Sequence, residues 1–158
     1  MKKVLLLVVC TCLTVATFAQ ENLTQTQKVF QNNIIKFLKE EGYSPTIDEG
    51  SIYFKNKDDS NNHYIKIFNE SPFFVIIQRI AGRSLEGEKA LDKTKALITC
   101  NNVNSSEKAI KVYCTEKFVL FVTEQYIHEE EDFKHSFFRN MKELKKSEKT
   151  FDDEYNDL

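Results

Sequence analysis

Glycine and proline are scarce in this 158-residue chain, which has four glycines and two prolines. The sequence lacks a glycine-rich phosphate-binding loop, the Gly-x-Ser-x-Gly turn of serine hydrolases and the His-Glu-x-x-His zinc motif. Its glycines fit helix caps, turns and helix packing instead; they are Gly42, Gly50, Gly82 and Gly87. No local motif therefore commits the chain to an enzymatic reaction, and we expect a protein that is not an enzyme.

The first 19 residues have the layout of a secretory signal peptide. Two lysines precede an apolar run over residues 4–13, which is too short for a membrane span of about 20 residues. Thr17 and Ala19 suit the two small-residue positions before a signal peptidase cut, so Gln20 becomes the first residue of the mature chain. We therefore expect an exported protein, either periplasmic or secreted.

The charge of the mature chain gives no reason to expect a nucleic-acid or membrane ligand. With the two signal-peptide lysines removed, 20 basic residues stand against 24 acidic ones, a net charge of −4. Nucleic acids and anionic membranes attract basic surfaces, and no second apolar run is long enough to cross a bilayer. We expect the partner to be a protein, with no nucleic acid and no membrane span.

Two of the four cysteines, Cys100 and Cys114, remain after the signal peptide is removed. An oxidising compartment would favour a disulfide between them. However, the pattern places Cys100 near the end of a helix and Cys114 at the far end of the next strand, roughly 20 Å away. A disulfide needs Cα atoms within about 7 Å, so we expect two buried thiols, with a bridge as the alternative.

Apolar spacing predicts a single α+β domain over residues 20–146, with an antiparallel sheet of about five or six strands. The predicted order is helix, three or four strands, helix, two strands, helix. Residues 73–80 are almost wholly apolar, which predicts a central strand buried on both faces. The acidic residues 147–158 are expected to form a frayed tail, with a short amphipathic helix that docks through residues 151, 155 and 158 as the alternative. The middle helix is expected over residues 85–103, with these side chains facing the core: Leu91, Thr94, Leu97 and Ile98.

The segment Ala-Leu-Ile-Thr-Cys-Asn-Asn-Val-Asn at residues 96–104, followed by the hairpin of residues 111–126, resembles the YbjN-like family. In that family a helix rich in Ala and Leu ends in an Asn-x-x-Asn-like segment, and Asn101 and Asn104 match this pair. The resemblance covers nearly all of the mature chain in element order. It implies the fold of type III secretion chaperones, protein binding and frequent dimerisation, with no catalytic residues. A signal peptide departs from the family pattern and argues against a chaperone role inside the cell.

Strand alternation also predicts a candidate contact surface on the sheet. If the apolar side chains at 52, 54, 65, 67, 110 and 112 face the helices, their neighbours lie on the opposite face. That face then carries Tyr53, Lys55, Tyr64, Lys66, Phe68, Lys111 and Tyr113. Aromatic rings among lysine stems are typical of protein interfaces, but they also cover ordinary solvated sheets, and both interpretations stay open. RNA-binding sheets share this pattern, but export and the negative charge argue against RNA.

One pair of residues could hold a metal ion. Glu131 and His135 are four apart and share a helix face. A closed zinc site needs four ligands, and acids near a helix N-terminus are favoured by the helix dipole alone. We therefore expect no metal and no cofactor.

These features together predict an exported, non-catalytic protein-binding domain that binds another protein or a second copy of itself. Two alternatives stay open. A small extracytoplasmic hydrolase or hydrolase inhibitor would show a cleft with clustered titratable side chains. A small-ligand carrier would show a closed apolar cavity.

Overall fold

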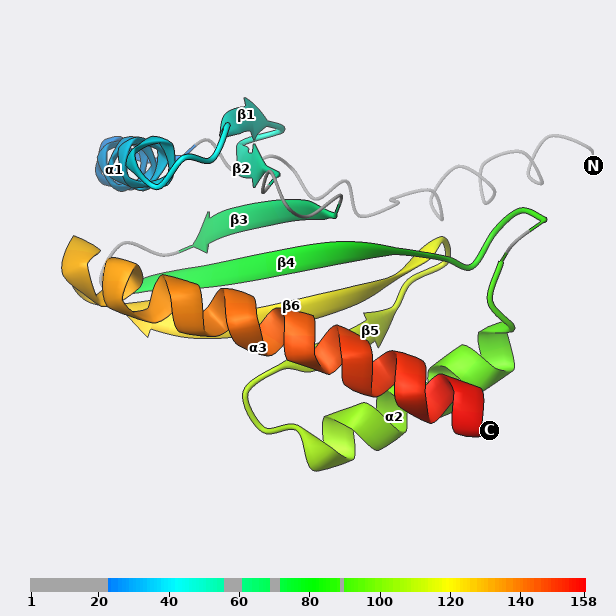
Figure 1. The fold of residues 1–158 in the computed structure, drawn as a ribbon. Helices are drawn as coiled ribbons and strands as arrows, with labels where there is room; N and C mark the ends of the chain where they lie inside the picture. Colours follow the sequence, from blue (N-terminus) through cyan, green and yellow to red (C-terminus); the bar gives the residue numbers. More distant parts are fainter. Residues whose placement is uncertain (1–22, 56–60, 69–71, 89) are drawn as a thin grey trace, which may run out of the picture.

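A computed structural model describes residues 23–55, 61–68, 72–88 and 90–158 of the chain (Figure 1). The predicted signal peptide of residues 1–19 lies outside the described residues and stays a prediction. Among the described residues, no helix combines the length and the apolar character that a membrane crossing requires.

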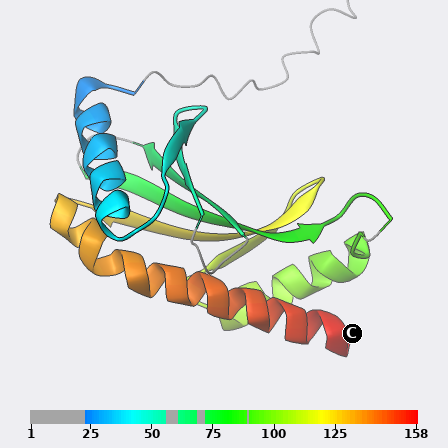
Figure 2. The ribbon, with the colours of Figure 1, turned by 45° about the horizontal axis from the view of Figure 1, so that its top comes forward.

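The described chain forms three helices and a six-stranded antiparallel sheet, which confirms the predicted α+β class. The spatial order of the strands is β1-β2-β3-β4-β6-β5, so the chain returns through α2 to the far edge before β6 pairs with β4. The helices lie along one face of the sheet, with α3 running its length (Figures 1 and 2). The elements are α1 (Gln25–Glu40), β1 (Thr46–Asp48), β2 (Ser51–Phe54), β3 (Asn62–Phe68), β4 (Phe73–Ser84), α2 (Lys93–Ser106), β5 (Lys111–Cys114), β6 (Phe118–Ile127) and α3 (Glu130–Asp157).

Local signals in the sequence fix both ends of α1. The Thr24 side chain accepts a hydrogen bond from the backbone of Gln27, and the Gln27 side chain accepts one from the backbone of Thr24. This reciprocal capping satisfies backbone N–H groups that would otherwise have no partner at the helix start. After the helix, Gly42 takes a φ of 84°, a left-handed conformation that costs glycine little.

Phenylalanine rings fill the space between the helices and the sheet. Phe37 of α1 meets Phe133 and Phe137 of α3 edge to face, with ring centroids 6.1 and 5.5 Å apart. Phe54 of β2 approaches Phe137 at 6.0 Å, so one ring of α3 contacts both another helix and the sheet. Edge-to-face pairs of this kind add to the stabilisation from burial alone.

The prediction for the middle helix was wrong in its start and in its buried face. The helix α2 begins only at Lys93, after Asp92 caps it by accepting a hydrogen bond from the backbone of Lys95 at 2.7 Å. Three of the side chains expected in the core are exposed: Leu97 at 54%, Ile98 at 45%, and Thr94. Leu91 lies before the helix and is half-buried against the core. The side chains that α2 buries are Ala96, Thr99, Cys100 and Val103. These are small or β-branched, so the helix axis can approach β5 and α3 closely.

The prediction that residues 73–80 are buried on both faces was also wrong. Val75, Ile77 and Arg79 are buried, whereas Phe74 and Ile76 between them are only half-buried. Burial therefore alternates from residue to residue in β4, although apolar residues on both faces hide this alternation in the sequence pattern. The strand also continues to Ser84, beyond the predicted end.

The acidic segment of residues 147–158 is helical rather than frayed, because α3 continues to Asp157. Phe151 is fully buried and meets Phe121 of β6 edge to face at 5.9 Å. Asp152 forms an ion pair with Arg83 of β4. The segment extends the buried stripe of α3 by further turns, and burial of Phe151 holds it against the sheet.

A buried ion pair joins α3 to the central strand β4. Arg79 is 3% exposed, and its Nε and Nη2 donate hydrogen bonds to Oε2 of Glu148 at 2.9 and 2.7 Å. Its Nη1 lies 2.9 Å from Nε2 of the fully buried His63, and since a guanidinium only donates, this nitrogen must accept. Glu148 also lies 3.4 Å from Arg83 Nη2. The carboxylate therefore compensates a guanidinium charge that would be costly to bury alone.

We predict that Glu148→Gln lowers the free energy of unfolding by about 2–4 kcal/mol, because it leaves the buried Arg79 charge without its carboxylate. Urea denaturation followed by circular dichroism measures the loss. Asp153→Asn is the matched control, since it neutralises an exposed carboxylate of the same helix and should change stability by less than about 0.5 kcal/mol. Equal losses in the two variants would contradict a structural role for the buried pair.

Candidate functional site

One face of the sheet has no described helix packed over it, and we call it the open sheet face (Figures 1 and 2). Strand register aligns its side chains in rows that run across the strands. The open sheet face consists of Tyr53, Asn62, Tyr64, Lys66, Phe68, Phe74, Ile76, Gln78, Ile80, Lys111, Tyr113, Leu120, Val122, Glu124 and Tyr126.

An aromatic row crosses three strands at one end of this face. Phe68 of β3 pairs with Phe74 of β4, which pairs in turn with Tyr126 of β6. The ring centroids are 6.2 and 5.0 Å apart along the row. Phe68 is 36% exposed and Tyr126 64% exposed. The row therefore presents a contiguous apolar surface, which is the kind of surface that marks contact sites on proteins.

Tyrosines form a second aromatic pair, on β2 and β3. The rings of Tyr53 and Tyr64 are 5.2 Å apart, and the Tyr53 hydroxyl hydrogen-bonds to Asn62 at 3.1 Å. Burial raises the pKa of Tyr64, and the nearby carboxylate of Asp48 raises it further. Both effects favour the neutral form of the Tyr64 phenol.

Charged groups of both signs lie among the aromatic side chains. Lys111 of β5 forms an ion pair with Glu124 of β6, and this hydrogen bond raises the pKa of Lys111. Lys66 lies in the same row as Ile76 and Glu124 and is half-buried, so its stem covers apolar surface. The face is therefore apolar in its rows of rings and mixed in charge between them.

The structure places most of the predicted site residues together on this face. Tyr53, Tyr64, Lys66, Phe68, Lys111 and Tyr113 all belong to the open sheet face. Lys55 is exposed directly after the end of β2. The side chains expected to face the helices are buried as predicted: Ile52, Phe54, Ile65, Ile67, Ile110 and Val112. A binding role for the open sheet face stays a prediction.

The sequence did not assign the contributions of β4 and β6 to this face. Phe74 and Tyr126 complete the aromatic row, and Ile76, Ile80 and Leu120 lie between the charged positions. Polar residues occur on both faces of these strands, Gln78 and buried Arg79 on β4 and Glu124 and Gln125 on β6. The sequence pattern therefore carried no signal that assigned these faces.

One asparagine of the pair that matches the YbjN-like pattern closes an edge of the sheet. The Asn104 side chain accepts a hydrogen bond from the Val112 backbone N–H at 2.7 Å and donates one to the Val112 carbonyl at 2.8 Å. Val112 belongs to the edge strand β5, so Asn104 occupies the backbone groups that point away from β6. Asn101 is exposed. The asparagine pair thus contains one residue with a structural function.

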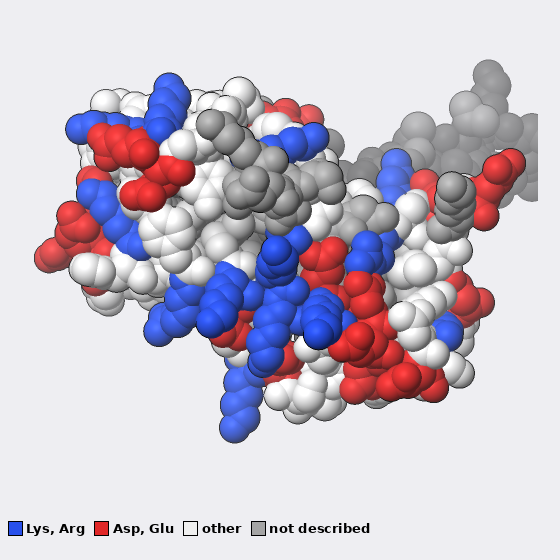
Figure 3. All heavy atoms as spheres, in the orientation of Figure 1, with Lys and Arg blue, Asp and Glu red and all other residues white. Residues whose placement is uncertain are grey.

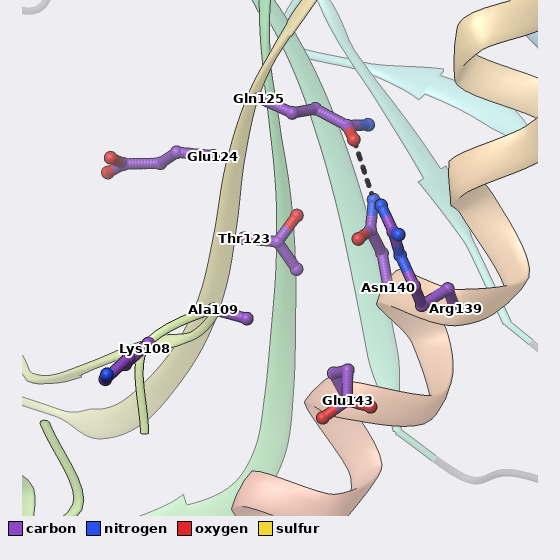
Figure 4. A pocket seen from close by; sticks show the side chains of 8 residues that line it. All are labelled: Lys108, Ala109, Thr123, Glu124, Gln125, Arg139, Asn140 and Glu143. Atoms are coloured by element: carbon purple, nitrogen blue, oxygen red, sulfur yellow. Dashed lines mark hydrogen bonds between the residues drawn. The ribbon is translucent and has the colours of Figure 1, made fainter. Parts of the chain in front are cut away.

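A pocket of about 460 Å³ lies on the helix side, between β6, α3 and residues 108–109 (Figure 4). Asn140 of α3 donates a hydrogen bond to Gln125 of β6 across it at 2.9 Å, while the Glu124 side chain points away (Figure 4). Arg139, Lys108 and Glu143 also line it. The lining contains neither histidine nor cysteine and is mostly polar. It therefore matches neither a closed apolar cavity nor a nucleophile beside a base.

Of the two residues considered for a metal ion, Glu131 has another partner and His135 is exposed. Glu131 and Glu130 both form ion pairs with Lys134, at 3.3 and 2.6 Å. Asp132 accepts hydrogen bonds from the backbone N–H groups of His128 and Glu129 at the start of α3. Within the described residues, no group of three or more His, Cys, Asp or Glu side chains is placed to hold a metal.

Comparisons of the chain with protein-family models, with curated proteins and with solved structures found no match. The YbjN-like resemblance therefore stays a prediction from the sequence.

We predict that Asn104→Ala lowers the free energy of unfolding by about 1–2 kcal/mol, because two backbone groups of Val112 lose their hydrogen-bond partner. Asn101→Ala is the control, since it makes the same change at an exposed site of the same helix. Alanine favours a helix more than asparagine does, and this gain in stability is common to both variants. Urea denaturation of the two variants measures the difference. A loss in Asn101→Ala as large as that in Asn104→Ala would show that the bonds to β5 contribute nothing.

Proposed function

We propose that this chain is an exported, non-catalytic protein-binding domain, related to the YbjN-like family, and that its open sheet face binds a second copy of the chain. The observation that carries the proposal is the exposed aromatic row of Phe68, Phe74 and Tyr126. Aromatic side chains held rigidly on strands provide large contact area at a low cost in conformational entropy. Export rests on the signal-peptide pattern of residues 1–19.

The helix side of the molecule is a less suitable binding surface. Lysine and arginine side chains gather over the middle of α3, and acidic side chains gather over its C-terminal end (Figure 3). Several of these charges are paired at the surface, such as Lys146 with Glu107 at 3.1 Å. Burying charged groups in the core of an interface costs desolvation free energy, whereas burying the rings of the aromatic row does not. We therefore assign binding to the opposite face.

A second copy suits the open sheet face because the face carries apolar rows and charges of both signs. In a two-fold dimer the same surface meets itself, so it must supply both partners of every charge pair. Lys66, Lys111 and Glu124 provide both signs within the apolar rows. Dimerisation is also what the YbjN-like resemblance implies.

The other two candidate functions have less support. The polar pocket beside Asn140 lacks the enclosed apolar walls that a ligand carrier needs. A hydrolase needs a nucleophile or an activated water beside a base, and the residues lining that pocket do not supply such a pair.

We predict that residues 20–158 form a dimer in solution and that Phe68→Glu converts it to a monomer, because the variant buries a carboxylate in the aromatic row. The expected rise in the dimer dissociation constant is about a hundredfold or more. Size-exclusion chromatography with light scattering over a concentration series measures it.

The matched control is Phe138→Glu, which makes the same change at a 51% exposed phenylalanine of α3 on the helix side. This control should remain dimeric, and circular dichroism should show that both variants are folded. A monomeric parent chain, or a dimer that Phe68→Glu leaves intact, would overturn self-association through this face.

A further inference from the structure

The structure brings Cys100 and Cys114 together, contrary to the sequence-based prediction. Their Sγ atoms lie 2.7 Å apart, with Cys100 on α2 and Cys114 at the end of β5. Both are free thiols in the structure, and this distance lies between the roughly 3.5–4.0 Å of ordinary contacts between carbon atoms and the roughly 2.05 Å of a disulfide bond. The expected separation of roughly 20 Å was therefore wrong.

The reason is that the chain turns back on itself between the two cysteines. Cys100 lies within α2, so the helix carries the chain about 9 Å further, to Ser106. The strand β5 then returns beside α2 and covers about 10 Å from Lys111 to Cys114. The outward and return paths are nearly equal in length, and the Asn104 bonds to Val112 hold them side by side.

We propose that Cys100 and Cys114 form an intramolecular disulfide that joins α2 to the edge strand β5. The oxidant is an external disulfide, either a small molecule such as oxidised glutathione or a protein. The proposal concerns the helix side of the sheet and does not depend on the proposed function of the open sheet face.

The surroundings of the two thiols assign the order of the exchange. Cys114 is half-buried and lines a pocket of about 460 Å³ together with Lys93 and Leu97, so an oxidant can reach it. Cys100 is 4% exposed, and burial raises the pKa of its thiol, with a further rise from the hydrogen bond to Cys114. Cys114 is therefore the first thiol to react and Cys100 the second.

The exchange balances in two steps. The Cys114 thiol gives up its proton, and its thiolate attacks one sulfur of the oxidant, which breaks the oxidant S–S bond and expels one thiolate. Cys100 then loses its proton and attacks the Cys114 sulfur, which expels the second oxidant thiolate. The two cysteines are oxidised by two electrons in total, and the oxidant is reduced to two thiols.

Peptide mapping tests the bond directly. The full chain is purified with reductant, exchanged into oxidised glutathione, alkylated to block remaining thiols and digested with trypsin. Cleavage after lysine places Cys100 in the peptide of residues 96–108 and Cys114 in that of residues 112–117. We expect these two peptides to be joined and to separate on reduction. Both peptides recovered alkylated, or either joined to the peptide containing Cys10 and Cys12, would overturn the proposal.

A thermal measurement separates the covalent bond from simple packing of the two thiols. The cysteines are 14 positions apart, and closing a loop of this size should raise the unfolding midpoint of the oxidised chain by on the order of 10 °C over the reduced chain. In Cys100→Ala and Cys114→Ala the difference between the oxidised and reduced midpoints should vanish. The difference between the reduced parent chain and each reduced variant then measures how much packing of the two thiols contributes. An oxidised parent chain that melts at the same temperature as the reduced one would contradict a stabilising bridge.

Discussion

The buried charge of Arg79 is the constraint on which the helix layer depends. A guanidinium on the covered face of a central strand requires a carboxylate from whichever element packs over it, and Glu148 of α3 supplies that group. Once Glu148 is fixed, the helical repeat places Leu144 and Phe151 against the same sheet face. The position and length of α3 thus follow from one ion pair together with a stripe of apolar side chains.

The sequence predicted the class of fold and the first helix because both depend on local signals. Thr24 and Gln27 act within three residues of each other at the start of α1, Gly42 acts on the turn directly after its end, and strand alternation is a repeat of two. The predictions that failed depend on distant contacts. Leu97 and Ile98 face outward because α2 packs closely through small side chains, which its own spacing does not reveal. The final turns of α3 are held by Phe121 and Arg83, which are far away in the sequence.

The candidate site was predictable in kind but not in extent. Alternation in β2, β3 and β5 separated the two faces because their inward positions are apolar except for His63. In β4 and β6 both faces carry apolar residues, so the pattern alone could not assign Phe74 or Tyr126. Only the pairing of the strands shows that these rings continue the row that begins at Phe68. The extent of a surface built across strands depends on which strands pair and in what register, and the pattern within a single strand does not show this.

The bonds from Asn104 to Val112 also have a consequence for the size of any assembly. An uncapped edge strand is a template on which further strands can be added without limit, as in fibrils. Here the outward backbone groups of Val112 are already occupied by a side chain of the same molecule. At the opposite edge, β1 is only three residues long and ends in Asp48, an acidic residue. The sheet is therefore poorly suited to grow sideways, so the dimer proposed above would be a closed, finite particle rather than a polymer.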